Sequence, residues 1–328
     1  MATTFKNLLS TDIATTRTLL HEALPITGTI VSGTYGDENI KEYSHGMFQS
    51  VYDYPYQSSS ANRIFDLTYG YASDLSGANP MNAKKMNIYS EMSLVLNGTN
   101  LEGNIPVFDR DGNLATSAST DRMNACIFIC YARLLTKDEI KKGSYTFSYI
   151  DGSLGLKTLG DYGAASDYRI TSPAGEFGLL YTSSVAPYGD SVGHIYYQAG
   201  IAVITASNDI WPNAIQSAWI DTDHITGACN DVRNMWVDNN FNNTTELNST
   251  IYFCRADSGD FNYSSNLTYL SQSQIIVKAG DPNNNSMAYI TTIGLYSADN
   301  ELLATAKLSE PIQKDPTNSL TFRVRLDY

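Results

Sequence analysis

The end of the chain has the most regular alternation of apolar and polar residues. Over residues 288–296, alternate side chains point to opposite faces of a predicted strand: Tyr289, Thr291, Ile293 and Leu295 share one face, and Ile290, Thr292, Gly294 and Tyr296 share the other. Residues 297–300 suit a four-residue hairpin loop, in which Asp299 or Asn300 tolerates a positive φ.

The return strand continues this pattern and places Leu302, Ala304, Ala306 and Leu308 inward. We expect a turn after Pro311, followed by a strand in which polar residues alternate with Leu320, Phe322, Val324, Leu326 and Tyr328. The three segments predict a C-terminal β-meander with one apolar face. Because chain ends usually fray, alternation that reaches the last residue predicts that the final strand is held in place.

Strand patterns also occur in residues 126–135, 144–150, 194–207, 249–256 and 272–279, and Gly200 divides the third of these into two runs. Two segments carry helix signals instead. Ser10 or Thr11 can cap a helix in which Ile13, Arg17, Leu20 and Leu24 recur at helical spacing until Pro25. Thr136 and Glu139 form a capping box for a short helix that Gly143 would end.

These patterns predict a mainly β fold: an antiparallel β-sandwich or jelly-roll-like core with one or two short helices and the C-terminal β-meander. We expect an N-terminal helix and first strand in residues 1–43, a central β-rich domain in residues 44–240, and an antiparallel β region in residues 241–328. A single domain is the alternative.

Composition narrows the range of partners. Charged residues make up 17% of the chain, compared with about 25% in typical soluble proteins, and Asn, Ser, Thr and 23 Tyr supply most of the polarity. A net charge of −13 disfavours nucleic acid, which would repel the chain. No targeting segment and no run of about 18 apolar residues is visible, so we expect no membrane partner.

The cysteines do not predict a disulfide or a metal site. Cys126 and Cys130 lie four residues apart in an apolar run, on the same face of a predicted strand but too far apart for an easy disulfide. Cys229, Cys254 and the four scattered histidines form no zinc-ligand pattern. Buried thiols are the favoured interpretation, and we expect no metal and no cofactor.

The common catalytic motifs are missing from the sequence, so we expect no enzyme. Asp109–Asn113 places oxygen ligands at alternate positions as a calcium loop does, but Leu114 stands where the loop needs glycine, which favours a hairpin turn. Asp221, Asp223 and His224 are close enough for a metal or acid–base site, although a polar loop is the favoured interpretation.

Tyrosines are concentrated in residues 44–71, where they could stack on sugar rings; a tyrosine-rich protein–protein surface or ordinary packing of these side chains is the favoured interpretation. Together with three residues of the C-terminal strands, they make up the candidate interface: Tyr52, Tyr54, Tyr56, Tyr69, Tyr71, Tyr296, Arg323 and Arg325.

Several blocks of the sequence carry a resemblance to a known family. The blocks LLHEALPITGTIVSGTY, HGMFQSVYDYPYQSSSANRIFDLTYG, ARLLTKDEIKKGS, FNNTTELNSTIYFCRA and AYITTIGLYSADNELLATAKLSEPIQKDP span nearly the whole chain. They resemble a family of virion structural proteins of tailed bacteriophages, notably contractile-tailed cyanophages. The last block also resembles a strand–turn–strand of phage tail and fibre-attachment proteins.

The resemblance implies a virion protein that is assembled in the host cytoplasm and has no catalytic activity. The C-terminal position of the last block favours the neck, tail or baseplate over a fibre. We expect copies of the chain and other virion proteins as partners, with a homo-oligomeric ring as the favoured arrangement. The alternatives are a receptor- or glycan-binding module and a tail-associated hydrolase.

Overall fold

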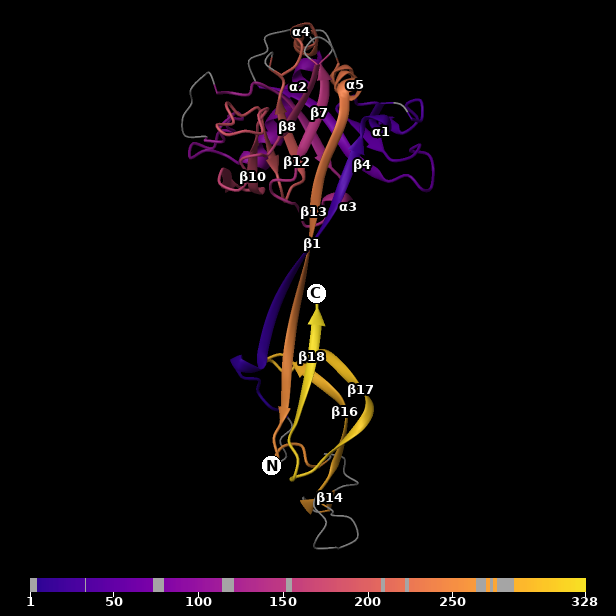
Figure 1. Cartoon of the computed structure of the whole chain (residues 1–328), viewed down its shortest axis with the longest axis vertical. Coiled ribbons are helices and arrows are strands. Elements are labelled where there is room, and N and C mark those ends of the chain that lie inside the picture. Colours follow the sequence, from indigo (N-terminus) through magenta and orange to yellow (C-terminus); the bar gives the residue numbers. More distant parts are fainter. Residues whose placement is uncertain are drawn as a thin grey trace. The chain divides into compact units, whose positions relative to one another are not determined.

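The computed structural model describes residues 5–32, 34–72, 80–113, 121–151, 155–207, 210–221, 224–263, 270–271, 274–275 and 286–328 (Figure 1). Strands make up 46% of the chain and helices 16%, which confirms the mainly β prediction. The chain divides into unit 1, residues Met1–Thr18 and Glu246–Tyr328, and unit 2, residues Leu19–Thr245. The strands β1 (Ile13–Thr27) and β13 (Trp236–Ala256) contribute residues to both units.

Unit 2 is built on a sheet of eight antiparallel strands. Their order is β2 (Ile40–Glu42), β3 (Gln49–Tyr52), β4 (Arg63–Tyr71), β5 (Ala125–Tyr131), β12 (Ile201–Thr205), β11 (Gly193–Tyr196), β10 (Gly175–Leu180) and β9 (Tyr168–Ser172). The central strand β5 is buried along almost its whole length, as its apolar sequence predicts. Gly200 separates β11 from β12 at a φ of 66°, so the predicted break is confirmed.

A second sheet covers one face of the first. In unit 2 it contains the end of β1 and the start of β13, together with β6 (Glu139–Ile140), β7 (Thr146–Asp151) and β8 (Gly155–Gly160). The Trp236 ring stacks on Phe65 of β4 at 4.9 Å, and the Phe241 ring lies 4.9 Å from Tyr131 of β5. Aromatic rings from the two inner faces therefore form the centre of a β-sandwich, which confirms the predicted sandwich-like core.

Five helices occur in the described residues, more than the one or two expected: α1 (Gly28–Ser32), α2 (Pro80–Asn97), α3 (Arg133–Thr136), α4 (Asn213–Asp221) and α5 (Ile225–Met235). Tyr89 of α2 packs 6.3 Å from Phe128, whose side chain points away from the second sheet, so α2 covers the other face. The Trp219 ring of α4 lies 5.9 Å from Tyr69, on the face that also carries the second sheet.

The predicted N-terminal helix is wrong, because Ile13–Thr27 forms the strand β1. The spacing of Ile13, Arg17, Leu20 and Leu24 suggested a helix, but the segment is rich in β-branched threonine and pairs with β13. Residues 13–23 of β1 are all exposed, so no apolar stripe is buried there.

The predicted helix after Thr136 is also wrong. The short α3 ends at Thr136, and Lys137 then adopts a φ of 56° that turns the chain. Glu139 and Ile140 pair with Thr244 and Asn243 of β13, and Ile140 is completely buried. Tertiary pairing therefore outweighs the local capping-box signal.

Unit 1 contains the C-terminal strands. The end of β13 pairs with β18 (Leu320–Asp327), and β16 (Ala288–Tyr296) forms a hairpin with β17 (Leu302–Lys314). The short strands β14 (Leu270–Ser271) and β15 (Gln274–Ile275) form a separate pair. The meander-like set of strands is therefore confirmed, although its last strand pairs with β13. Backbone hydrogen bonds of 2.9 and 3.1 Å between Tyr328 and Asn248 hold the final residue, as predicted.

The β16–β17 hairpin has the predicted loop conformation, but the faces of β16 and the end of β17 differ from the prediction. Asn300 has the predicted positive φ, 64°. A bulge between Ile290 and Thr292 shifts the pairing, so Ile293 and Leu295 are half-buried on the face of Ile290, not on that of Tyr289. The strand β17 also continues through Pro311 to Lys314, because Pro311 lies where four residues of β17 have no regular partner on β16.

A buried carboxyl group in unit 2 gives its stability a pH dependence. Asp161 is 1% exposed and accepts hydrogen bonds from the backbone N–H groups of Gly143 (2.7 Å) and Tyr145 (3.0 Å) and from the Tyr197 hydroxyl (3.1 Å). Burial raises its pKa from 3.8 to about 6, and these hydrogen bonds only partly offset that effect. The folded state therefore retains this proton at a pH where the unfolded chain has lost it.

We expect the free energy of unfolding of the wild type, relative to Asp161→Asn, to fall as pH rises from 4 to above 6. The stabilising contribution is complete below the unfolded pKa and is lost as pH passes the folded pKa; the range from 3.8 to about 6 corresponds to roughly 3 kcal/mol. Urea denaturation of both proteins across this range measures the difference. A difference that does not change with pH would contradict the assignment.

Candidate assembly surface

The structure separates the predicted tyrosines of unit 2. Tyr54 and Tyr56 are 49% and 38% exposed, and Tyr52, which is half-buried, lies 6.4 Å from the Tyr56 ring. Tyr71 is also half-buried. Tyr69 is only 1% exposed because its side chain points into the core, so it cannot belong to a surface. The exposed part of the predicted cluster is therefore limited to residues 52–56.

The other predicted interface residues lie in unit 1. Tyr296 is 47% exposed and makes an edge-to-face contact with Phe5 at 5.1 Å. Arg323 and Arg325 lie on the exposed face of β18, where Arg325 pairs with Asp327 at 2.7 Å. Such an exposed ion pair contributes little to stability. Of the three, Tyr296 alone lines the groove described next.

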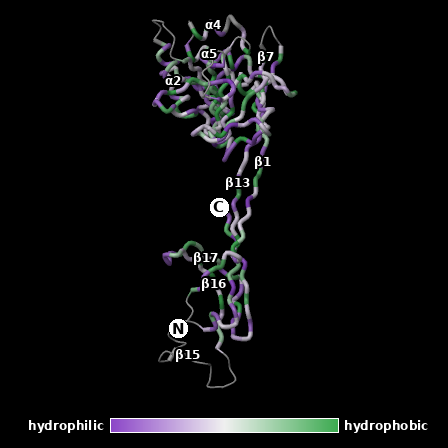
Figure 2. Tube along the Cα trace, turned by 90° about the vertical axis from the view of Figure 1, so that its left-hand side faces the viewer, coloured by the Kyte–Doolittle hydropathy of each residue, from purple (hydrophilic) through white to green (hydrophobic). Residues whose placement is uncertain are grey.

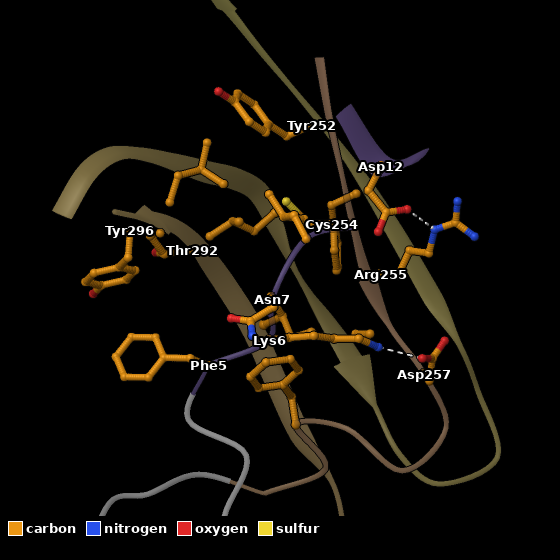
Figure 3. A pocket seen from close by; sticks show the side chains of 18 of the residues that line it. Phe5, Lys6, Asn7, Asp12, Tyr252, Cys254, Arg255, Asp257, Thr292 and Tyr296 are labelled. Atoms are coloured by element: carbon orange, nitrogen blue, oxygen red, sulfur yellow. Dashed lines mark hydrogen bonds and ion pairs between the residues drawn. The ribbon is translucent and has the colours of Figure 1, made fainter. Parts of the chain in front are cut away.

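An open groove of about 1600 Å³ lies inside unit 1 (Figure 3). One wall is β16 with the start of β17, and the other is the β13–β18 pair, from which Tyr252, Cys254 and Phe322 line the groove. The N-terminal segment of residues 5–13 completes the lining, and Figure 3 shows Phe5 on the side of Tyr296. In the part of unit 1 that the structure describes, the hairpin and the β13–β18 pair are thus two layers with a groove between them.

Ion pairs hold the N-terminal segment in this position. The Lys6 ammonium group lies 2.5 Å from the Asp257 carboxylate and 2.6 Å from that of Asp260, and Asp12 pairs with Arg255 at 2.7 Å. The hydrogen bond to Asp257 is the main reason that the pKa of Lys6 is raised, and the hydrogen bond from Lys6 lowers the pKa of Asp260. Each charge at this end of the groove has an opposite charge beside it.

Unit 1 buries little apolar surface in its described residues. Ala256 and Val324 are its only buried hydrophobic residues there, whereas unit 2 contains the rest of the core. The large hydrophobic residues that unit 1 exposes are Phe5, Leu9, Ile13, Leu247, Met287, Tyr289, Tyr296, Leu302, Leu303, Ile312 and Tyr328. Apolar and polar residues follow each other along β16 and β17 (Figure 2). Neither strand buries an apolar side chain.

A buried lysine takes the place of an apolar residue at the end of β17. Lys314 is 0% exposed, and its ammonium group donates to the Asn262 side-chain oxygen at 2.6 Å and to the Asp315 carbonyl at 2.8 Å. These bonds join the turn after β17 to the segment that follows β13. They fix local geometry, but a polar contact of this kind does not replace a hydrophobic core.

The candidate chemical sites do not form a reactive centre among the described residues. Asp221 is described by its backbone alone, Asp223 lies outside the described residues, and His224 is exposed. Across the described ranges, no group of three or more His, Cys, Asp or Glu side chains is placed to hold a metal ion. Within the same ranges, no helix is long and apolar enough to cross a membrane.

The segment around Asp109 forms a turn, in agreement with the turn interpretation of this sequence. The Gly112 N–H donates to the Asp109 carbonyl at 3.1 Å, and the Asn113 N–H donates to the Asp111 carboxylate at 2.9 Å. Burial raises the pKa of Asp109 to about 7. Burial also acts on Asp111, but hydrogen bonds from Asp109 and Asn113 outweigh it and lower the pKa of Asp111. The pKa values of the two neighbouring carboxyl groups are therefore shifted in opposite directions.

The cysteines carry free thiols. Cys126 and Cys229 are buried, as expected, and Cys130 and Cys254 are half-buried. Burial raises the pKa of Cys130 to about 12, so its thiol stays protonated and unreactive.

Sequence reasoning missed most of the groove. Phe5, Tyr289 and Leu303 line it and are 55%, 60% and 68% exposed, but Tyr296 is the one predicted interface residue among those that line the groove. The alternation along β16 and β17 could have predicted these residues. Both faces of each strand carry large apolar residues, whereas the outward face of a strand exposed to water would carry polar ones.

Comparisons with protein-family models, with curated proteins and with solved structures found no match to this chain.

Proposed function

We propose that this chain is a structural component of a tailed-phage virion, in the neck, tail or baseplate, and that it acts by protein–protein assembly without catalysis. The observation that carries the proposal is an imbalance among the described residues of unit 1, which expose many large apolar side chains and bury few. Exposed apolar surface on this scale is typical of an interaction site. The sequence resemblance to virion structural proteins supplies the setting.

The division into units supports the same function. Unit 2 has a sandwich core and can serve as a rigid body, whereas unit 1 presents a large groove and a hairpin whose strands, among the described residues, pair only with each other. A two-stranded hairpin is marginally stable in water without a further layer. A chain of this kind gains stability when neighbouring subunits cover unit 1, as happens in an assembled particle.

Quantitative mass spectrometry of purified particles tests this function. We expect the chain in each particle at a small multiple of three, six or twelve copies relative to the major capsid protein. A count in the hundreds would place it in the capsid surface or the tail tube instead. Particles that lack the chain would contradict a virion role.

A receptor- or glycan-binding module is the second candidate, favoured by the exposed aromatic side chains of residues 52–56. Tyr54 lies 5.9 Å from the Tyr35 ring, so neighbouring aromatic faces are available at this surface. Aromatic side chains stack on sugar rings through such faces. A glycan array probed with the purified chain, with Tyr54→Ala as a comparison, distinguishes this function from assembly.

A further inference from the structure

We propose that the groove of unit 1 is filled by unit 1 of a second copy of this chain, so that the unit completes its core only in an oligomer. This inference rests on the proposed assembly function and names the partner. It depends on the size of the groove, on the charges of the two units and on the free strand edges around the groove.

The size of the groove favours a protein segment over a small ligand. Its volume is about 1600 Å³, whereas sites for small molecules usually enclose roughly 300–1,000 Å³. Large apolar side chains from three different segments line it, namely Phe5, Tyr289 and Leu303. A strand or hairpin with its own apolar side chains fits this space and removes these residues from water.

The charge of each unit shows where two copies can approach. Unit 1 has eight Lys and Arg against ten Asp and Glu, a net charge of −2. Unit 2 has thirteen against twenty-four, a net charge of −11. Copies repel each other through unit 2 but hardly at all through unit 1, so self-association is favoured at unit 1.

The groove does not select a strongly charged partner. Lys6 and Arg255, the cations that line it, are paired with Asp257 and Asp12 within unit 1. An acidic or basic partner would have to break these pairs before it gained new ones. A nearly neutral surface with large apolar side chains suits the groove better, and unit 1 itself is such a surface.

Free strand edges provide backbone partners for the second copy. Among the described residues, β16 and β17 pair only with each other, so each has an outer edge without a neighbouring strand. Unpaired edges bind further strands through their N–H and C=O groups. The same unit thus offers a groove, protruding apolar residues such as Leu303, and strand edges, which is the combination that contact between copies requires.

The test compares Leu303→Asp with Ile170→Asp in the full-length chain, by light scattering after size exclusion and by analytical ultracentrifugation. Leu303 in β17 is 68% exposed and Ile170 in β9 of unit 2 is 72% exposed, so neither change should unfold the monomer. We expect an oligomer for the wild type and for Ile170→Asp. Burying a new charge should weaken association of Leu303→Asp by about 100-fold.

Photo-crosslinking identifies the contact. A benzophenone amino acid replaces Tyr296, and light and ¹⁵N-labelled chains are mixed before irradiation. Crosslinks that join a light to a heavy peptide of unit 1 support the proposal. A wild-type chain that remains monomeric, crosslinks confined to one chain, or an oligomer unaffected by Leu303→Asp would overturn it.

These outcomes are separable from those for the proposed function. If the chain is monomeric but present in particles, the groove belongs to another virion protein, and the virion role stands without this inference. If the chain forms oligomers through unit 1 but is missing from particles, the inference stands and the virion role fails.

Discussion

We expect a chain shortened to residues 19–245 to unfold in one cooperative transition and to remain monomeric. It retains every buried hydrophobic residue of the described structure except Ala256 and Val324, including the aromatic contacts between its two sheets. By contrast, we expect residues 246–328 alone to show no cooperative transition, because the described residues of this segment bury too little apolar surface to offset the entropy of ordering the chain.

Near-ultraviolet circular dichroism and urea denaturation of the two fragments and the full chain measure this difference. The full chain serves as the reference for the transition of unit 2, which should appear at a similar urea concentration in the fragment. A fragment of residues 246–328 that folds as a monomer would contradict this expectation. An oligomeric fragment of residues 19–245 would locate self-association in unit 2.

We expect Trp236→Ala to destabilise unit 2 by about 3–5 kcal/mol, the range for removal of a large buried aromatic side chain. The Trp236 ring is 3% exposed, stacks on Phe65 at 4.9 Å and meets Phe147 edge-on at 4.7 Å. It therefore joins the two sheets, and its loss leaves a cavity between them. The free energy of unfolding from urea titration measures the effect.

Trp236→Phe is the matched variant. It keeps an aromatic ring against Phe65 but removes the indole N–H that donates to the Ile26 carbonyl at 3.3 Å. We expect it to cost about 1–3 kcal/mol, mainly because the carbonyl loses its buried partner. Equal losses for the two variants would show that the hydrogen bond, and not packing between the sheets, is the dominant contribution of Trp236.

Assembly through unit 1 would give the chain a simple form of control. A subunit whose apolar groove is filled only by a second copy is least stable when free and most stable when incorporated. Unit 2, with its strongly negative charge, would remain soluble and would keep copies apart elsewhere. The difference in stability between the free and the incorporated subunit would then favour assembly.

The helices α2 and α5 were not predicted, although each has a helical pattern of apolar residues. In α2, Lys85, Ile88, Tyr89 and Leu96 are buried at helical spacing, and in α5 the buried residues Ile225, Ala228, Cys229 and Val232 follow the same spacing. Both patterns are present in the sequence. They were obscured by polar neighbours, since the segment that contains α5 reads as a polar loop around His224.

The sequence by itself determined the mainly β fold, the central apolar strand, the break between two strands at Gly200 and the alternating C-terminal strands, because each depends on residues close together in the chain. Only the tertiary structure decided that Ile13–Thr27 is a strand, since pairing with β13 outweighs its helical spacing. It also decided which apolar residues are buried. Tyr69 and Tyr289 are both tyrosines in strands, yet one is 1% and the other 60% exposed, because burial depends on the layers that pack above each strand, and these come from distant parts of the chain.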